Sequence, residues 1–194
     1  MVPRAEIAHW AFGALFLLLG LLLLAEAVVT PGVFRRRRWR AYLWPSTVLT
    51  AGVLLWLVAI FSTFSTLHLL AHSVWAQAAM IAGAVQLALV RGKLTSPAWS
   101  LVTAAAMVAT GASFLIHEQN GWLFARSSFL HHALGWTMIA AAIFPLGEAL
   151  RPRRAVWSVG FALTFVLVAV FLFSDRDVEP IFGKLSDLAG APSP

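Results

Sequence analysis

The stretch that decides the fold is residues 155–174, AVWSVGFALTFVLVAVFLFS, which contains no charged side chain. A helix of about 20 residues crosses the roughly 30 Å hydrocarbon core of a bilayer, so this stretch predicts a transmembrane helix. Five further apolar stretches run approximately over 8–29, 41–63, 67–90, 97–117 and 127–147. The whole chain is 60% hydrophobic and 11% charged, whereas soluble domains average about 25% charged residues. The sequence therefore predicts an integral membrane protein.

The fold class expected for this chain is all-α, with six transmembrane helices in one bundle. Lipid leaves the backbone only helices or closed barrels, and the long Ala-, Leu- and Val-rich stretches lack the alternation of barrel strands. We expect the bundle to fill residues 1–174 and to be followed by a short extracytoplasmic tail, 175–194. The first apolar stretch is interpreted as a retained helix rather than a cleaved signal peptide, because cleavage would leave the arginines after it on the translocated side.

Basic residues gather in alternate loops, and this predicts the orientation of the bundle. Five, two and three of the 14 Lys and Arg residues lie in the loops after the first, third and fifth stretches. They are Arg35, Arg36, Arg37, Arg38 and Arg40; Arg91 and Lys93; and Arg151, Arg153 and Arg154. The positive-inside rule makes these loops cytoplasmic and puts both termini outside, in the inner (plasma) membrane. We expect Arg35–Arg40 to contact anionic lipid headgroups, and we expect no nucleic-acid partner.

With this orientation every histidine falls at the outer end of a helix. The six are His9, His68, His72, His117, His131 and His132. The i, i+4 spacing puts His68 and His72 on one helix face. Successive residues such as the last two histidines are about 100° apart around a helix, so only one of that pair is expected to face a given centre.

The histidines at the outer end predict a metal site. The proposed ligand set is His68, His72, His117 and one of His131 or His132, with Glu118 at its rim and His9 as a bystander. Imidazole and carboxylate ligands suit copper, zinc, iron or nickel, and the chain has no cysteine to supply a thiolate. The cofactor expected is copper or another transition metal ion, which the protein would bind for uptake, delivery or tolerance.

Other residues are expected to serve packing. Gln77 and Gln86 predict hydrogen bonds between helices, and Gly83, Gly111 and Gly135 predict close helix contacts. Seven tryptophans near predicted helix ends are typical of the interfacial aromatic belt. They are Trp10, Trp39, Trp44, Trp75, Trp99, Trp122 and Trp157.

Catalytic signatures are missing from the sequence. It contains no Walker-type loop, nucleophile elbow, zincin motif or dinucleotide fingerprint, which argues against a hydrolase or a nucleotide-driven pump. We do not expect an enzyme; if the protein is one, a membrane oxidoreductase is the class expected.

The string Leu67-His68-Leu69-Leu70-Ala71, followed by Val74-Trp75, resembles a stretch of the copper-resistance D (CopD) family of bacterial inner-membrane proteins. Members of that family carry His-Leu-Leu-Ala-x-x-x-Trp there and handle copper at the periplasmic face. The resemblance implies a metal-ligand role for His68 alone. The chain departs from the family after the tryptophan, where Ala76-Gln77-Ala78 replaces the usual glycine pair.

Two other interpretations remain open. Transmembrane b-type cytochromes hold haem between histidines of neighbouring helices, and His72 with His132 would supply such a pair for a haem b that exchanges electrons with quinone. Alternatively, the chain is an accessory subunit of a larger membrane complex, or it forms a homo-oligomer, and its histidines are only interfacial. The sequence does not show whether the third, fourth and fifth helices are neighbours, and the proposed site depends on this.

Overall fold

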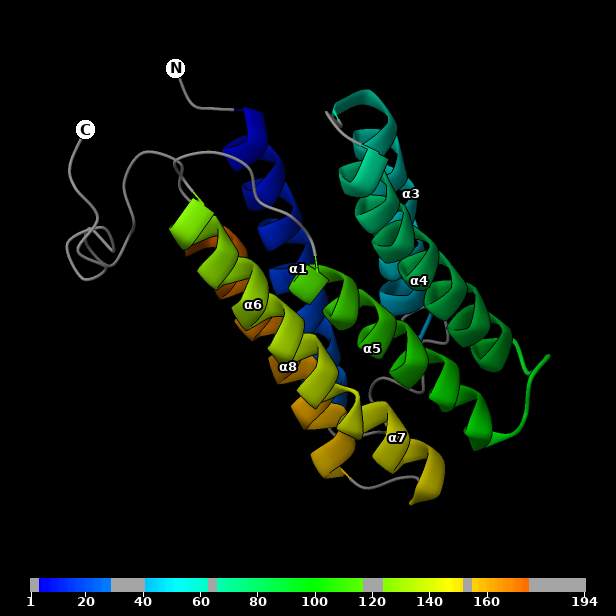
Figure 1. Ribbon diagram of the computed structural model, residues 1–194. Helices are drawn as coiled ribbons and strands as arrows, with labels where there is room; N and C mark the ends of the chain where they lie inside the picture. Colours follow the sequence, from blue (N-terminus) through cyan, green and yellow to red (C-terminus); the bar gives the residue numbers. More distant parts are fainter. Residues whose placement is uncertain (1–3, 29–40, 63–65, 117–123, 152–154, 175–194) are drawn as a thin grey trace.

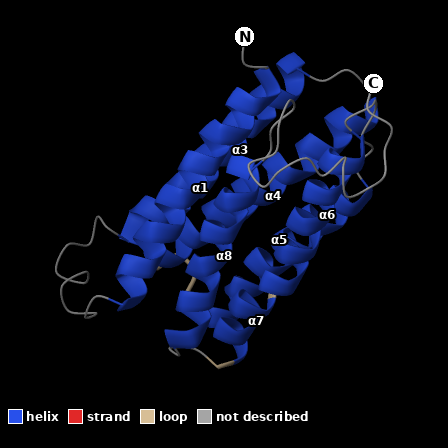
Figure 2. Cartoon of the chain, turned by 90° about the vertical axis from the view of Figure 1, so that its left-hand side faces the viewer, coloured by secondary structure: helices blue, strands red, loops and turns tan. Residues whose placement is uncertain are grey.

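The computed structural model describes residues 4–28, 41–62, 66–116, 124–151 and 155–174. All regular structure in these ranges is helical (Figure 2). The helices are α1 (Arg4–Val28), α3 (Leu43–Ser62), α4 (Thr66–Val90), the short 3₁₀ helix η2 (Pro97–Trp99), α5 (Ser100–Ile116), α6 (Phe124–Ala141), α7 (Ile143–Leu150) and α8 (Ala155–Ser174).

Five segments of the described chain have the length and apolarity of membrane spans. They are Ile7–Val28, Leu69–Val90, Pro97–Ile116, Ser128–Leu150 and Ala155–Ser174. The protein is therefore a polytopic helical membrane protein, as the sequence predicted. A sixth segment, α3, has 20 residues, which corresponds to about 30 Å of helix; its part Leu43–Leu57 is apolar. The sixth crossing stays a prediction.

The helices pack in a closed series around the bundle. α1 lies along α8, α8 packs against α6, α6 against α5, α5 against α4, α4 against α3, and α3 again against α1 (Figure 1). Apolar side chains fill the interior of this series. One cluster joins Leu19 and Leu23 of α1 with Val48 of α3 and Phe165 of α8. At the level of this cluster the bundle therefore has a packed apolar core and not a channel.

Glycines set the closest helix crossings. A Cβ added at Gly83 of α4 would lie 2.9 Å from the Pro45 carbonyl oxygen of α3, and one at Gly20 of α1 would lie 3.0 Å from the Ala162 carbonyl oxygen of α8. Side-chain carbons do not approach backbone oxygens so closely, so only glycine permits these crossings. The predicted close contact at Gly83 is confirmed.

The stretch predicted as one helix over 127–147 is divided into α6 and α7, and this corrects the prediction. The division falls at Ala142, whose N–H is shared between the carbonyl oxygens of Met138 and Ile139, each at 3.2 Å. Pro145 has no N–H to donate to the carbonyl of Ala141, so the regular hydrogen-bond ladder cannot continue through this point. The bend directs α7 against α5 and α8 (Figure 1).

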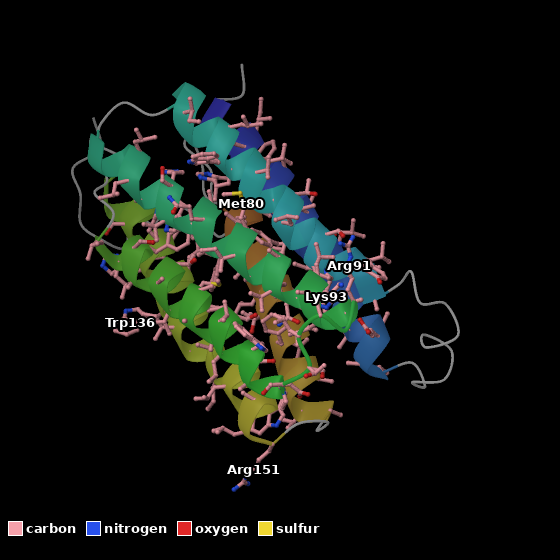
Figure 3. The ribbon with its side chains drawn as sticks, turned by 90° about the vertical axis from the view of Figure 1, so that its right-hand side faces the viewer. Met80, Arg91, Lys93, Trp136 and Arg151 are labelled. Carbon is pink, nitrogen blue, oxygen red and sulfur yellow. The ribbon has the colours of Figure 1, made fainter. Side chains whose placement is uncertain are left out.

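The two ends of the bundle differ in their side chains. Gly13 of α1 packs against Phe173 of α8, so α1 begins and α8 ends at the same end of the bundle. The exposed Arg91, Lys93 and Arg151 lie toward the opposite end (Figure 3). This separation agrees with the predicted charge asymmetry, while the assignment of one end to the outside stays a prediction. Arg35–Arg40 and the tail 175–194 lie outside the described residues.

Candidate functional site

Helices α4 and α6, which carry predicted metal ligands, both pack against α5, and the last residue of α5 directly precedes His117 in the sequence. The approach of α5 to α6 depends on two glycines. A Cβ on Gly111 would lie 2.6 Å from the carbonyl oxygen of Gly135, and a Cβ on Gly135 would lie 2.9 Å from that of Gly111. The predicted close contacts at Gly111 and Gly135 are thus confirmed. They bring the C-terminal turns of α5 against the turn of α6 that contains Gly135.

Four aromatic rings connect these helices at the end of the bundle where α1 begins. On α4, His72 lies 4.4 Å from Trp75 between ring centroids, with a tilt of 52°. Trp75 stacks on Phe114 of α5 at 4.0 Å and 20°. Phe114 in turn contacts His131 of α6 at 5.6 Å and 49°. We call His72, Trp75, Phe114 and His131 the aromatic series. A stacked pair such as Trp75–Phe114 contributes about 0.5–1.5 kcal/mol beyond area burial.

Trp75 is held by a hydrogen bond to the neighbouring helix. Its indole N–H donates to the hydroxyl of Ser113 on α5, and Ser113 donates to the carbonyl oxygen of Thr110 at 2.8 Å. The ring is only 7% exposed. The assignment of Trp75 to the interfacial belt was therefore wrong: this side chain packs between α4 and α5, because Ser113 satisfies its single donor inside the bundle.

His131 and His132 leave α6 on different faces. His131 is buried, at 8% exposure, and faces Phe114. His132 is exposed, and its Nδ1 lies 2.7 Å from the backbone carbonyl oxygen of Ser128 one turn earlier. The angular difference expected from a helix explains this separation, but only the packing of α6 against α5 decides that His131 is the inner one.

The remaining predicted ligands are only partly described. The backbone of His68 lies in the first turn of α4, one turn before His72, but its side chain is outside the description. His117 and Glu118 directly follow the last residue of α5 in the sequence and also lie outside the described residues. Among the residues that are described, no group of three His, Asp or Glu side chains is placed to hold a metal ion. A three-ligand centre would therefore need His68, His117 or Glu118 in addition to the aromatic series.

The layer beneath the aromatic series is apolar. Leu134 of α6 clusters with Val168 and Leu172 of α8, and Phe114 and Met138 pack against this cluster. Methionine sulfur is a weak ligand, but Met138 serves here as packing against neighbouring apolar side chains. The aromatic series thus lies at one end of the bundle, next to an interior filled with apolar side chains.

Below this layer, one polar pair joins α4 to α5. The Gln86 amide donates to the hydroxyl oxygen of Thr103 at 3.1 Å, which confirms the predicted interhelical role of Gln86. Gln77 is exposed. Gln86 and Thr103 belong to the half of α4 and α5 that is remote from the aromatic series, and they contribute to helix packing rather than to a site.

Comparisons with known proteins do not add to this description, since no family model, no curated protein and no solved structure matches the chain.

Proposed function

We propose that this protein binds a transition metal ion, with copper favoured, at the end of the bundle that carries its histidines. The observation that supports the proposal is the packing of α5 between α4 and α6. This packing connects His72 of α4 to His131 of α6 through the rings of Trp75 and Phe114. The other ligands that the sequence predicts are close to these helices along the chain. His68 is one turn before His72, and His117 with Glu118 follows α5.

The chemistry of this set favours an ion that accepts nitrogen and oxygen ligands. Imidazoles and one carboxylate suit Cu(II) or Zn(II), and a soft Cu(I) site would be expected to include sulfur ligands. Met138 packs in the apolar layer below, and Met80 packs close to Gly52 of α3. We therefore place Cu(II) first. Copper, in either oxidation state, is also the metal that the resemblance to the copper-resistance D family implies for His68.

The filled interior favours binding at one face over passage through the bundle. Large apolar side chains occupy the clusters below the aromatic series, on α1, α3, α5, α6 and α8. An ion at the histidines would have to lose every polar ligand to pass them, and burying an uncompensated charge costs several kcal/mol or more. Delivery to a partner or tolerance by sequestration is thus better supported than conduction by a single chain.

The test is copper binding by the purified, detergent-solubilised protein. We expect about one Cu(II) per chain, and we expect the double variant His68→Ala/His72→Ala and the single variant His131→Ala to weaken binding by more than about tenfold, since even outer-shell partners of metal ligands are worth 10–100-fold. His132→Ala is the matched control, because this neighbouring side chain points away from the aromatic series. Bound Cu(II) should also quench Trp75, whose ring lies 4.4 Å from that of His72; the quenching should be absent in Trp75→Phe.

The same preparation separates the alternatives. A Soret band in the purified protein would support a haem protein, although the pair named from the sequence is not favoured, because His132 is on the outer face of α6. A metal-free, colourless protein that copurifies with a larger complex would support an accessory subunit. Copper binding that is unchanged in His68→Ala/His72→Ala and in His131→Ala would refute the site proposed here.

A further inference from the structure

Helix α5 contains no histidine, cysteine or acidic residue, yet two of its consecutive residues are linked to imidazoles on both neighbouring helices. Ser113 binds Trp75 of α4, whose ring contacts His72. The next residue, Phe114, contacts His131 of α6 directly. Successive positions of a helix point about 100° apart, and α5 packs against both α4 and α6. One turn of α5 therefore serves both neighbours.

The hydroxyl of Ser113 fixes the indole of Trp75. Ser113 has a single O–H and donates it to the carbonyl oxygen of Thr110 at 2.8 Å, so toward the indole this hydroxyl can only accept. The N–H of Trp75 is the donor of that second bond. Phe114 stacks on the same indole at 4.0 Å and 20°. The ring is thus held at its edge by a hydrogen bond and across one face by a second ring.

Held in this way, the indole restricts the imidazole of His72. Trp75 follows His72 by three residues, a spacing that places two side chains next to each other on one helix face. Their ring centroids are 4.4 Å apart. The terminal torsion of a histidine side chain is intrinsically broad, so a fixed neighbour at this distance limits how far the ring can turn. The direction of the ring nitrogens of His72 therefore depends on Trp75, and through Trp75 on Ser113.

We infer that Ser113 and Phe114 are positioning residues of the metal site: Ser113 orients His72 through Trp75, and Phe114 orients His131. This inference rests on the proposed function, and it adds that the affinity for the metal is controlled from α5. An imidazole that is already directed loses less conformational freedom when an ion binds to it, which favours binding. Outer groups that orient metal-bound histidines are worth about 10–100-fold in affinity in metalloproteins.

The first test needs no metal. In the metal-free protein with isotope-labelled histidine, the ring current of Trp75 should displace the ring-proton NMR resonances of His72, which are assigned by their loss in His72→Ala. Ser113→Ala should move these resonances and leave those of the exposed His132 unchanged. Gln86→Leu is the matched control. It also removes a hydrogen bond between α4 and α5, but at a position about 21 Å along α4 from His72, at 1.5 Å per residue, and should leave the His72 resonances in place.

The second test uses Cu(II). Ser113→Ala, Trp75→Phe and Phe114→Leu should each weaken Cu(II) binding by about tenfold, the lower end of the effect of orienting groups. Each should also change the electron paramagnetic resonance spectrum of bound Cu(II), which reports the ligand geometry. Ser113→Ala/Trp75→Phe should bind no more weakly than Trp75→Phe, because both changes act through one ring. Trp75→Phe supplies the same measurements if Ser113→Ala does not fold, and Gln86→Leu should leave affinity and spectrum unchanged.

The two tests separate this inference from the proposed function. If the unaltered protein does not bind Cu(II) while Ser113→Ala still moves the His72 resonances, the proposed function fails and with it the metal role of these residues, but the orientation of His72 by Ser113 stands. If Cu(II) binds and Ser113→Ala and Trp75→Phe change neither the His72 resonances nor the Cu(II) spectrum, the inference is overturned and the proposed function stands. Equal changes in Gln86→Leu would also overturn it, since they would show only a general loosening between α4 and α5.

Discussion

Replacing Gly111 by alanine should separate α5 from α6 and weaken the protein at the aromatic series. The added Cβ would lie 2.6 Å from the carbonyl oxygen of Gly135 and 2.7 Å from a side-chain carbon of Ile139. An ordinary contact needs at least 3.4 Å, so the helices must move apart by about 0.8 Å, the difference between 3.4 and 2.6 Å. The oxygen belongs to a helix backbone, and it cannot yield by a side-chain rotation.

The cost follows from that displacement. A radial gap of about 0.5–1 Å removes a quarter to a half of the dispersion attraction between facing atoms, and overpacking of this kind costs about 1–3 kcal/mol. Phe114, three residues after Gly111, would lose part of its contact with His131. We therefore expect Gly111→Ala to lower the free energy of unfolding by about 1–3 kcal/mol and to weaken copper binding.

The assay is unfolding by SDS titration in mixed micelles, followed by circular dichroism, together with the copper titration. Gly13→Ala is the control, since its Cβ would meet only the ring of Phe173, at 3.2 Å, and that ring can shift. If Gly111→Ala is as stable as the unaltered protein, or if Gly13→Ala costs more, the close α5–α6 crossing does not carry the stability assigned to it.

Two hydrogen bonds give further predictions. Ser113→Ala leaves the buried N–H of Trp75 without its acceptor and should cost about 1–3 kcal/mol in the same unfolding assay, whereas adding Trp75→Phe to Ser113→Ala should cause little further loss from this bond. A purely additive double variant would contradict that coupling. Gln86→Leu removes the 3.1 Å bond to Thr103 and should cost about 0.6 kcal/mol, the average for such bonds in membranes, and no more than about 1.7. In a double-mutant cycle with Thr103→Val, a coupling energy of zero would show that the pair does not contribute.

Hydropathy alone predicted most of the fold. Each predicted span corresponds to a helical segment, because a chain in lipid must satisfy its backbone hydrogen bonds within each crossing. The break between α6 and α7 at Ala142 was not predicted, although Pro145 is visible in the sequence. The apolarity of a stretch indicates that it can cross a bilayer, but it does not show whether the helix hydrogen bonds continue without interruption. Gln86 and the glycines were assigned correctly, because a buried amide and a missing side chain each have few roles in a bundle.

The site was predicted less completely. Histidines at corresponding helix ends indicated where to look, and helix direction predicted that His72 and the His131/His132 pair lie at comparable depth. No local pattern indicated that Trp75 would turn inward, because a tryptophan near a helix end is equally suited to the interface. Its burial depends on Ser113, 38 residues away along the chain. A local pattern cannot show a partner supplied by another helix.

The amino-acid sequence by itself determined that this is a helical membrane protein with several apolar spans, and it predicted that the histidines and most of the basic residues lie at opposite ends. These properties follow from the apolarity and charge of each segment, and they need no knowledge of its neighbours. Only the tertiary structure decided that α5 lies between α4 and α6 and that His131 faces inward while His132 faces out. Those outcomes depend on which helix faces pack together. In lipid, close fit and hydrogen bonds decide how helices pack, because the acyl chains are as apolar as the helix surfaces and hydrophobicity does not favour one face over another.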